Sequence, residues 1–169
     1  MPSERIAKFE KVSFKEFKKS VLETVITSDE QIQEWYDNIK LPQRATTGSA
    51  GYDFYAPFDI DIPNESFSIV IPTGIRCKIN DGWVLSCYPR SSLGFKYALG
   101  LDNTVGIIDS DYYYSSNEGH IKLKLHAKNT VHVDTGKAFS QGIFTPYGIT
   151  YDDNVTETRD GGFGSTDKK

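Results

Sequence analysis

Four short segments of the chain combine glycine or hydroxyl residues with one or two charged side chains. In chain order they are residues 49–53 (SAGYD), 89–94 (PRSSLG), 106–112 (GIIDSDY) and 159–166 (RDGGFGST). These residue types suit phosphate, metal ions and water, because backbone amides, hydroxyls and a guanidinium can surround anionic oxygens. All four border runs that read as β-strands, so we expect loops or strand ends on a rigid scaffold, where chemistry usually lies.

The second segment has hydrogen-bond donors suited to binding a polyphosphate. Arg90 supplies a planar fork of donors, and Ser91 and Ser92 add two hydroxyls directly after it. A guanidinium with this fork fits phosphate oxygens bidentately. The alternative reading is a strand-to-helix turn with a serine cap, and the segment alone leaves both open.

The last segment places an aromatic ring in a polar, glycine-rich tail. Phe163 has no core of its own there, so it either docks on the body of the protein or stacks on a flat ligand such as a base. Arg159, the backbone at Gly164, and the hydroxyls of Ser165 and Thr166 are suited to phosphate. A plain linker is the competing interpretation.

The remaining polar candidates lie near the first and third segments. Asp109 follows an apolar strand, where a carboxylate can orient a water, accept its proton or bind a sugar hydroxyl. Asn103 has a donor and an acceptor that can read a base edge, and Tyr112 can place a ring against a sugar. Asp53, after small residues, can hold a metal through water.

The elements that must position these residues are mainly short strands. Alternating runs at 67–71, 75–79, 83–88, 121–126 and 131–133, separated by glycine and proline turns, indicate an all-β sandwich or barrel. Before them, residues 4–12 predict a strand and residues 13–40 predict two short helices, which begin at a capping box at Ser13 and a second cap at Ser28. We therefore expect an N-terminal strand and helical segment at 1–42, a β domain at 43–150 and a flexible closing arm at 151–169.

Composition limits the class of protein. The 169 residues suffice for one domain with a core, and a net charge of −4 argues against a surface that coats nucleic acid. We see no apolar run of about 18 residues and no signal-peptide pattern, so no membrane partner is expected. The two cysteines, Cys77 and Cys87, lie in strand-like runs and read as reduced, buried thiols of a cytoplasmic protein.

Taken together and in this order, the four segments resemble the motifs of the trimeric dUTPases (deoxyuridine triphosphate nucleotidohydrolases). The resemblance covers residues 43–166 and implies a jelly-roll-like β-sandwich, a homotrimer and active sites at subunit interfaces. It also implies Mg²⁺-assisted hydrolysis of dUTP to dUMP and pyrophosphate, which removes dUTP and supplies dUMP for dTMP synthesis.

The resemblance assigns a role to each candidate residue. Asp109 would orient the attacking water and contact the sugar 3′-hydroxyl, and Asp53 would act on the water shell of the metal. The substrate-binding residues it implies are Arg90, Ser91, Ser92 and Gln141 for phosphate, Asn103 for uracil, Tyr112 for deoxyribose, and Arg159, Phe163, Gly164, Ser165 and Thr166 in the closing arm.

Two departures from the family pattern are visible. Ala138 stands where the fourth family motif has arginine, while Lys137 offers another cation and Gln141 is retained. Residues 113–118 (YYSSNE) look like an insertion, which is either a surface loop or a contact with a protein partner or a neighbouring subunit. We assign no role to the helical segment before residue 41.

Two other functions remain possible from sequence. The first is a dCTP deaminase, or a bifunctional deaminase–dUTPase, of the same fold; lysine stands where we align the deaminase glutamate, in the run 119–124, which counts against it. The second is a nucleotide-responsive regulatory protein that keeps the pocket and acts through a partner. Product analysis with dUTP and dCTP distinguishes the three.

Overall fold

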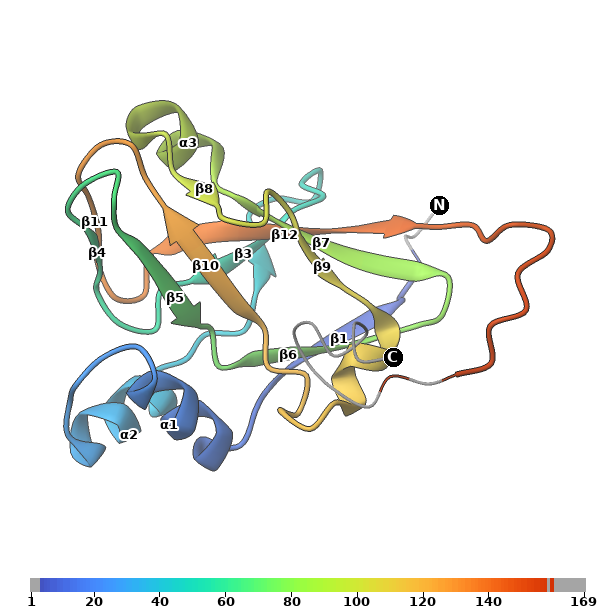
Figure 1. The fold of residues 1–169 in the computed structure, drawn as a ribbon, viewed down its shortest axis with the longest axis horizontal. Coiled ribbons are helices and arrows are strands. Elements are labelled where there is room, and N and C mark those ends of the chain that lie inside the picture. Colours follow the sequence, from blue (N-terminus) through green and yellow to red (C-terminus); the bar gives the residue numbers. More distant parts are fainter. Residues whose placement is uncertain (1–3, 158, 160–169) are drawn as a thin grey trace.

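A computed structural model describes residues 4–157 and 159 of the chain, and Figure 1 shows its fold. The strands are β1 (Ala7–Lys11), β2 (Gln43–Arg44), β3 (Tyr52–Tyr55), β4 (Ile60–Ile62), β5 (Ser68–Pro72), β6 (Ile75–Ile79), β7 (Trp83–Pro89), β8 (Gly100–Leu101), β9 (Gly106–Ile108), β10 (Lys122–His126), β11 (Val131–Val133) and β12 (Ala138–Pro146). The helices are α1 (Phe14–Leu22), α2 (Asp29–Asp37) and α3 (Ser91–Tyr97), with a 3-10 turn, η1 (Ser110–Tyr114).

The strands pair antiparallel throughout the described chain. The largest sheet has the order β2-β3-β12-β7-β9, and a second sheet has the order β5-β10-β8. Two smaller pairs, β1-β6 and β4-β11, complete the framework. Buried and exposed residues alternate along β10 and β11, as expected for strands with one face on a core and one face in water.

The two N-terminal helices share the core with the sheets. Phe17, Val21 and Ile32 are completely buried and belong to the same apolar cluster as Ile71 and Leu125 of the strands. Figure 1 shows α1 and α2 side by side beneath β5 and β10, at one end of the molecule. The helical segment is therefore packed into the β structure, and its apolar faces help to hold that end of the sandwich.

Most of the predicted strands are present at nearly the expected bounds. The runs expected at 75–79 and 131–133 coincide with β6 and β11, and the others differ by one or two residues at an end. The turns between them use glycines with positive φ, including Gly74 (φ 72°) and Gly82 (φ 82°). The strand expected at 4–12 is shorter, because β1 pairs with β6 only over Ala7–Lys11.

One element matches an alternative that the sequence left open, and one was not expected. Residues 91–97 form α3, so the second polar segment is a strand-to-helix turn, but its cap residue is Arg90 and no side chain makes a cap hydrogen bond. Strand β12 runs for nine residues through the centre of the largest sheet, although it contains Gly142. A Cβ at Gly142 would lie 2.7 Å from Leu85 Cδ1 and 3.0 Å from Phe54 Cε2, so only glycine fits this close approach.

The capping box predicted at Ser13 is only half formed. Ser13 Oγ accepts a hydrogen bond from the Glu16 amide at 3.2 Å, so α1 begins where expected. The Glu16 carboxylate does not return to the Ser13 amide; it turns inward and accepts from Ser20 Oγ at 3.0 Å. The carboxylate of Glu118, far along the chain, takes its place on Ser13.

In residues 4–157 and 159, no helix has the length and apolarity that crossing a lipid bilayer would need. Cys77 and Cys87 are both buried and carry free thiols, as predicted.

Candidate functional site

Two of the polar segments, 49–53 and 89–94, meet with Gln141 in one open pocket of about 560 Å³. Antiparallel pairing explains the meeting, because Gln141 of β12 is opposite Asp53 of β3 on one side and Tyr88 of β7 on the other. Arg90 follows the end of β7 directly. The pocket is lined by Ala45, Ser49, Ala50, Gly51, Asp53, Arg90, Ser91, Ser92, Gln141 and Ile143.

Charge and small residues define this pocket. Arg90 Nε lies 3.5 Å from Asp53 Oδ1, so the guanidinium and the carboxylate hold each other at the rim. The Asp53 side chain is 19% exposed and that of Arg90 is 41% exposed, which leaves both accessible to a ligand. Gly51 leaves room for Gln141, since a Cβ at residue 51 would lie 2.7 Å from Gln141 Oε1. The arrangement offers a cation, hydroxyls, an amide and one carboxylate to an anionic ligand.

The third segment forms a separate polar turn. Asp109 is the N-terminal cap residue of η1, and its side chain is 45% exposed. Arg159 approaches it closely: Nη2 donates to Asp109 Oδ2 at 2.6 Å, and Nε lies 3.2 Å from Asp111 Oδ1. The Arg159 guanidinium also lies 5.8 Å from the centre of the Tyr112 ring. The arm arginine therefore contacts the same turn as the two residues proposed for water and sugar.

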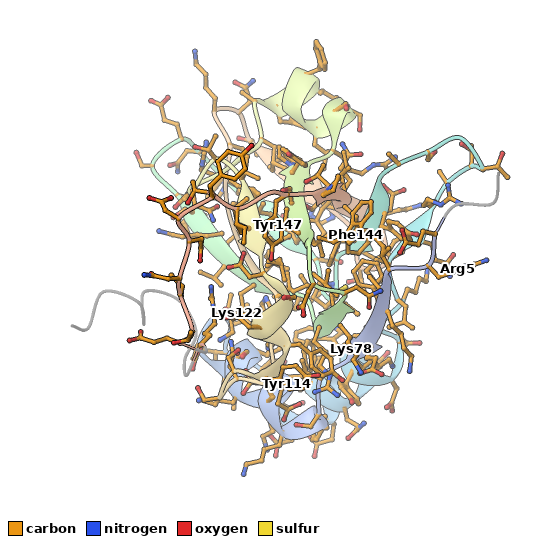
Figure 2. The ribbon with its side chains drawn as sticks, turned by 90° about the vertical axis from the view of Figure 1, so that its right-hand side faces the viewer. Arg5, Lys78, Tyr114, Lys122, Phe144 and Tyr147 are labelled. Carbon is orange, nitrogen blue, oxygen red and sulfur yellow. The ribbon has the colours of Figure 1, made fainter. Side chains whose placement is uncertain are left out.

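A second hollow of about 500 Å³ lies beside this turn. It is lined by Lys78, Ile79, Asp81, Ser110, Asp111, Tyr114 and Arg159. Figure 2 shows Lys78 and Tyr114 close together on the face where Tyr147 also lies. Ser110 Oγ donates to Asp81 Oδ1 at 3.1 Å, which ties the start of η1 to the β6–β7 turn.

Tyr112 is fixed within the chain. Its hydroxyl donates to the His120 carbonyl at 2.8 Å and accepts from Asn117 Nδ2 at 2.8 Å. Burial raises the pKa of the Tyr112 phenol above its ordinary value, against the lowering effects of Asn117 and Arg159, so the hydroxyl stays protonated as the donor. The ring position thus depends on the loop at 115–120.

Asn103 occupies an exposed turn between β8 and β9. Its neighbour Asp102 is anchored, because Lys124 Nζ lies 2.9 Å from Asp102 Oδ2 and His126 Nδ1 lies 2.8 Å from Asp102 Oδ1. The hydrogen bond from Lys124, followed by that from His126, holds the pKa of Asp102 below its ordinary value. The two residues of β10 thereby fix the start of the Asn103 turn.

One chain does not bring Asp109 to the pocket of Asp53 and Arg90. In the β7–β9 ladder Ile108 pairs with Leu85, which lies four residues, or about 13 Å of strand, before Pro89. Figure 1 shows the same separation, with α3 at the upper end and the yellow turn η1 at the lower end. The segments expected to form one site therefore lie at two places on the protomer.

Four predicted arm residues lie outside the described part of the chain: Phe163, Gly164, Ser165 and Thr166. Sequence reasoning also missed residues that the structure ties to the third segment. Glu118 and His120 hold the loop after η1, and nothing in the local pattern indicates their partners, since both bond to α1 or its cap about 100 residues away.

The fold and the pocket together define a β-sandwich protein with an open site suited to a polyphosphate. Residues 37–167 match the family model described as dUTPase. The deoxyuridine 5′-triphosphate nucleotidohydrolase of Lactococcus lactis is 38% identical over 133 residues, covering 76% of this chain and 88% of its own. That of Acinetobacter baylyi is 37% identical over 147 residues, covering 81% and 91%.

A solved structure agrees with these matches. The crystal structure of the dUTPase from Streptococcus mutans is similar with a TM-score of 0.62 and 30% identity, covering 84% of this chain and 97% of that one. The chain belongs to the dUTPase family. The family, the mostly β fold with a few helices, and the expected class of enzyme, a nucleotidohydrolase, are thereby confirmed.

Proposed function

We propose that this protein hydrolyses dUTP to dUMP and pyrophosphate, by attack of a water oriented by Asp109 on the α-phosphate. The observation that carries this proposal is the pocket in which Asp53, Arg90, Ser91, Ser92 and Gln141 converge from separate segments. Its volume of about 560 Å³ lies in the range of small-molecule sites. Relatives of this protein carry the name deoxyuridine 5′-triphosphate nucleotidohydrolase.

The pocket residues bind the triphosphate. Arg90 presents its fork to phosphate oxygens, and the exposed hydroxyls of Ser91 and Ser92 begin α3 beside it. Gln141 donates its side-chain amide from the centre of the sheet. Positioning and charge neutralisation supply most of the catalysis in attack at phosphorus, so rigid strands and a rigid helix start are suitable supports.

The donor set fits Mg²⁺. Magnesium in phosphate sites is usually held by one or two carboxylates together with substrate phosphates and waters. The pocket has one carboxylate, Asp53, half-buried at the rim and close to the phosphate-binding side chains. When bound, the ion neutralises charge on the triphosphate. Asp53 would hold the ion through its water shell, and Arg90 would bind the phosphates beside it.

Asp109 aims the attacking water. As the cap residue of η1 it has a fixed backbone, and its half-exposed carboxylate can accept a hydrogen bond from water. The new bond joins the water oxygen to the α-phosphorus, and the bond from that phosphorus to the bridging oxygen breaks to release pyrophosphate. Tyr112, on the same turn, sets the sugar, and Asn103 reads uracil.

The working form is a homotrimer whose sites lie between subunits. The support is the separation within one protomer: the phosphate pocket lies at one end of β7, and the Asp109 turn lies about 13 Å or more away along the sheet. A neighbouring copy that docks its Asp109 turn over the pocket completes the site. The arm at 151–169, through Arg159, Phe163, Gly164, Ser165 and Thr166, closes over the substrate.

The alternative functions have less support. On β10, the strand after the third motif, Lys122 pairs with Glu23 and Lys124 pairs with Asp102. Lysine thus stands where we align the glutamate of the deaminases, which counts against deamination. A regulatory role draws on Ala138 and the 113–118 loop. That loop, however, packs on the N-terminal segment of its own chain through Tyr113 and Glu118.

The two free thiols agree with a reducing compartment, and we infer that the protein works in the cytoplasm. Burial raises the pKa of the Cys87 thiol to about 12 and that of Cys77 well above its ordinary value, so both stay protonated.

The decisive experiment replaces the proposed water-orienting carboxylate. Asp109→Asn is expected to bind dUTP nearly as well as the unaltered protein and to lose about 10²–10⁴-fold in kcat, because only the water loses its partner. Pyrophosphate release with Mg²⁺ measures turnover, and isothermal titration with a non-hydrolysable dUTP analogue measures binding. Asp61→Asn, at an exposed carboxylate of β4 that pairs with His132 and lines neither hollow, is the matched control and keeps kcat within a few-fold.

Unchanged turnover in Asp109→Asn would remove this residue from the mechanism. Ammonia release from dCTP, with no pyrophosphate from dUTP, would replace the proposed function by deamination.

A further inference from the structure

We propose that the N-terminal segment formed by β1 and α1 is a brace that positions the Asp109–Tyr112 turn, with Glu118 and His120 as the positioning residues. The proposal rests on the proposed function, since it assigns these residues an effect on how the turn handles the sugar and the water. It gives a role both to the helical segment before residue 41 and to the loop at 113–118.

The loop that follows η1 folds back onto Tyr112. Ser115 Oγ donates to the Tyr112 carbonyl at 2.5 Å, and Asn117 Nδ2 donates to the Tyr112 hydroxyl at 2.8 Å. That hydroxyl in turn donates to the carbonyl of His120 at 2.8 Å. Tyr112 is therefore held from three points of residues 115–120, and a shift of this loop moves its ring.

Glu118 joins the loop to the start of α1. Its two carboxylate oxygens accept from the Ser13 amide at 2.8 Å and from Ser13 Oγ at 2.6 Å. Burial raises the pKa of Glu118, but the Ser13 hydrogen bonds and nearby cations outweigh it, so the net pKa is below the ordinary value. Glu118 also adopts φ 60°, a left-handed conformation that a non-glycine residue keeps only where its surroundings fix it.

His120 joins the end of the loop to the middle of α1. Its ring is fully buried, and Nε2 accepts from the Gly74 amide at 2.9 Å. Nδ1 therefore carries the proton, and it lies 3.2 Å from both Glu16 Oε1 and Ser20 Oγ. Glu16 and Ser20 are buried as well, so this polar cluster is satisfied only while α1 and the loop stay together.

A third attachment comes from β1. Tyr113 donates its hydroxyl to Glu10 Oε2 at 2.5 Å, and the Arg76 guanidinium lies 4.3 Å from the centre of the Tyr113 ring. Glu10 lies on β1 and Arg76 on its partner strand β6, where the two side chains form an ion pair at 3.2 Å. Residues 113–120 are thus held at Tyr113, at Glu118 and at His120.

The contacts of the brace suggest that loosening it shifts the Asp109–Tyr112 turn without unfolding the protein. The brace contacts neither the phosphate pocket nor Asp109 directly, and it reaches the turn through Tyr112 and the 115–120 loop. A displacement of about 1 Å at a reacting group can reduce a rate about 100-fold. Loosening Glu118 should therefore alter discrimination between deoxyribose and ribose before it unfolds the protein.

The test compares selectivity in Glu118→Ala with the full-length unaltered protein. kcat/KM is measured for dUTP and for UTP by pyrophosphate release, and their ratio is expected to fall about tenfold or more. The ratio does not depend on the folded fraction, because the same active molecules act on both substrates. Hydrogen–deuterium exchange is expected to speed up at residues 109–120 and to stay unchanged in β7 and β12.

Two further variants calibrate the result. Glu118→Gln keeps the side-chain shape with one acceptor and one donor facing Ser13, and should restore most of the selectivity. Glu23→Ala is the matched control: it also removes a contact of the α1 end, an ion pair with Lys122 at 3.2 Å, but Lys122 lies on β10 outside the loop. Its ratio should equal that of the unaltered protein.

An unchanged ratio in Glu118→Ala, with Asp109→Asn inactive in the same assay, would overturn the brace and leave the proposed function standing. Full activity of Asp109→Asn would instead overturn the proposed function. Should Glu118→Ala not fold, Ser13→Ala is compared in its place. It removes the hydroxyl half of the same contact and, with it, the hydrogen bond that caps α1. Unchanged selectivity there would overturn the brace as well.

Discussion

The buried imidazole of His120 makes the free energy of unfolding depend on pH in a defined direction. Burial, followed by the nearby Lys122 charge, lowers the pKa of His120 from 6.5 to about 3 in the folded protein. Between these values the unfolded chain binds a proton that the folded chain does not. Stability contributed by neutral His120 is therefore complete above pH 6.5 and is lost as the pH falls toward 3.

The magnitude follows from this linkage. Between pH 7.5 and pH 5.5 the unfolded histidine passes from mostly neutral to mostly protonated, while the folded one stays neutral. The free energy of unfolding should fall by about 1.4 kcal/mol over this window from His120 alone. No discount for solvent screening applies, because the ring is fully buried.

The perturbation is His120→Gln, whose amide can accept from the Gly74 amide and donate toward Glu16 without titrating. Urea unfolding at pH 7.5 and 5.5, at one fixed protomer concentration, gives the free energies. The unaltered protein should lose about 1.4 kcal/mol more than the variant across the window. Comparing the two proteins cancels the contributions of other groups.

Those other groups act differently. Hydrogen bonds from Asp61 and Asp134 raise the pKa of His132, so its stability is present below pH 6.5 and is lost as the pH rises. The Lys8 and Tyr113 hydrogen bonds lower the pKa of Glu10 to about 2, so its contribution is lost only as the pH falls below about 4.5. Equal losses in the unaltered protein and in His120→Gln would refute the assignment of a neutral, depressed histidine.

Two further predictions concern the pocket and the assembly. Gly51→Ala should leave the melting temperature nearly unchanged, because the clash is with the flexible end of Gln141, and should raise KM for dUTP about tenfold, the value of one hydrogen bond to a charged group; an unchanged KM would contradict the role of Gln141. Arg90→Ala and Asp109→Asn chains, each inactive alone, should regain about one quarter of the activity when refolded together at equal amounts, because a site between subunits can draw its two halves from different chains. No recovery in the mixture would place both halves of the site in one chain.

Local signals were sufficient for much of the fold. The hydroxyls of Ser13 and Ser28 cap the two helices, as predicted. The bounds of β6 and β11 followed from alternating residues between glycine-containing turns. Strand β12 was not predicted, because Gly142 and Pro146 interrupt the β pattern. Glycine is needed at position 142 because Leu85 and Phe54 approach its backbone closely, and both lie far away in sequence.

In the candidate site, too, local motifs identified residues, while the distances between them depended on contacts far apart in sequence. The four segments contain Asp53 and Arg90, the family resemblance adds Gln141, and the structure brings these three together. The distance of Asp109 from them was not predictable, since it follows from the strand register. The inward turn of Glu16 was hidden for a similar reason: its partner His120 is 104 positions away.

The neighbouring positions Gln141 and Gly142 set a limit for engineering the substrate range of this enzyme. Gln141 lines the pocket, and Gly142 approaches Leu85 and Phe54 closely, so a backbone shift in β12 that reshapes the pocket also displaces Leu85 and Phe54. Directed evolution toward other nucleotides should therefore accumulate changes in the surrounding turns and leave this strand unaltered.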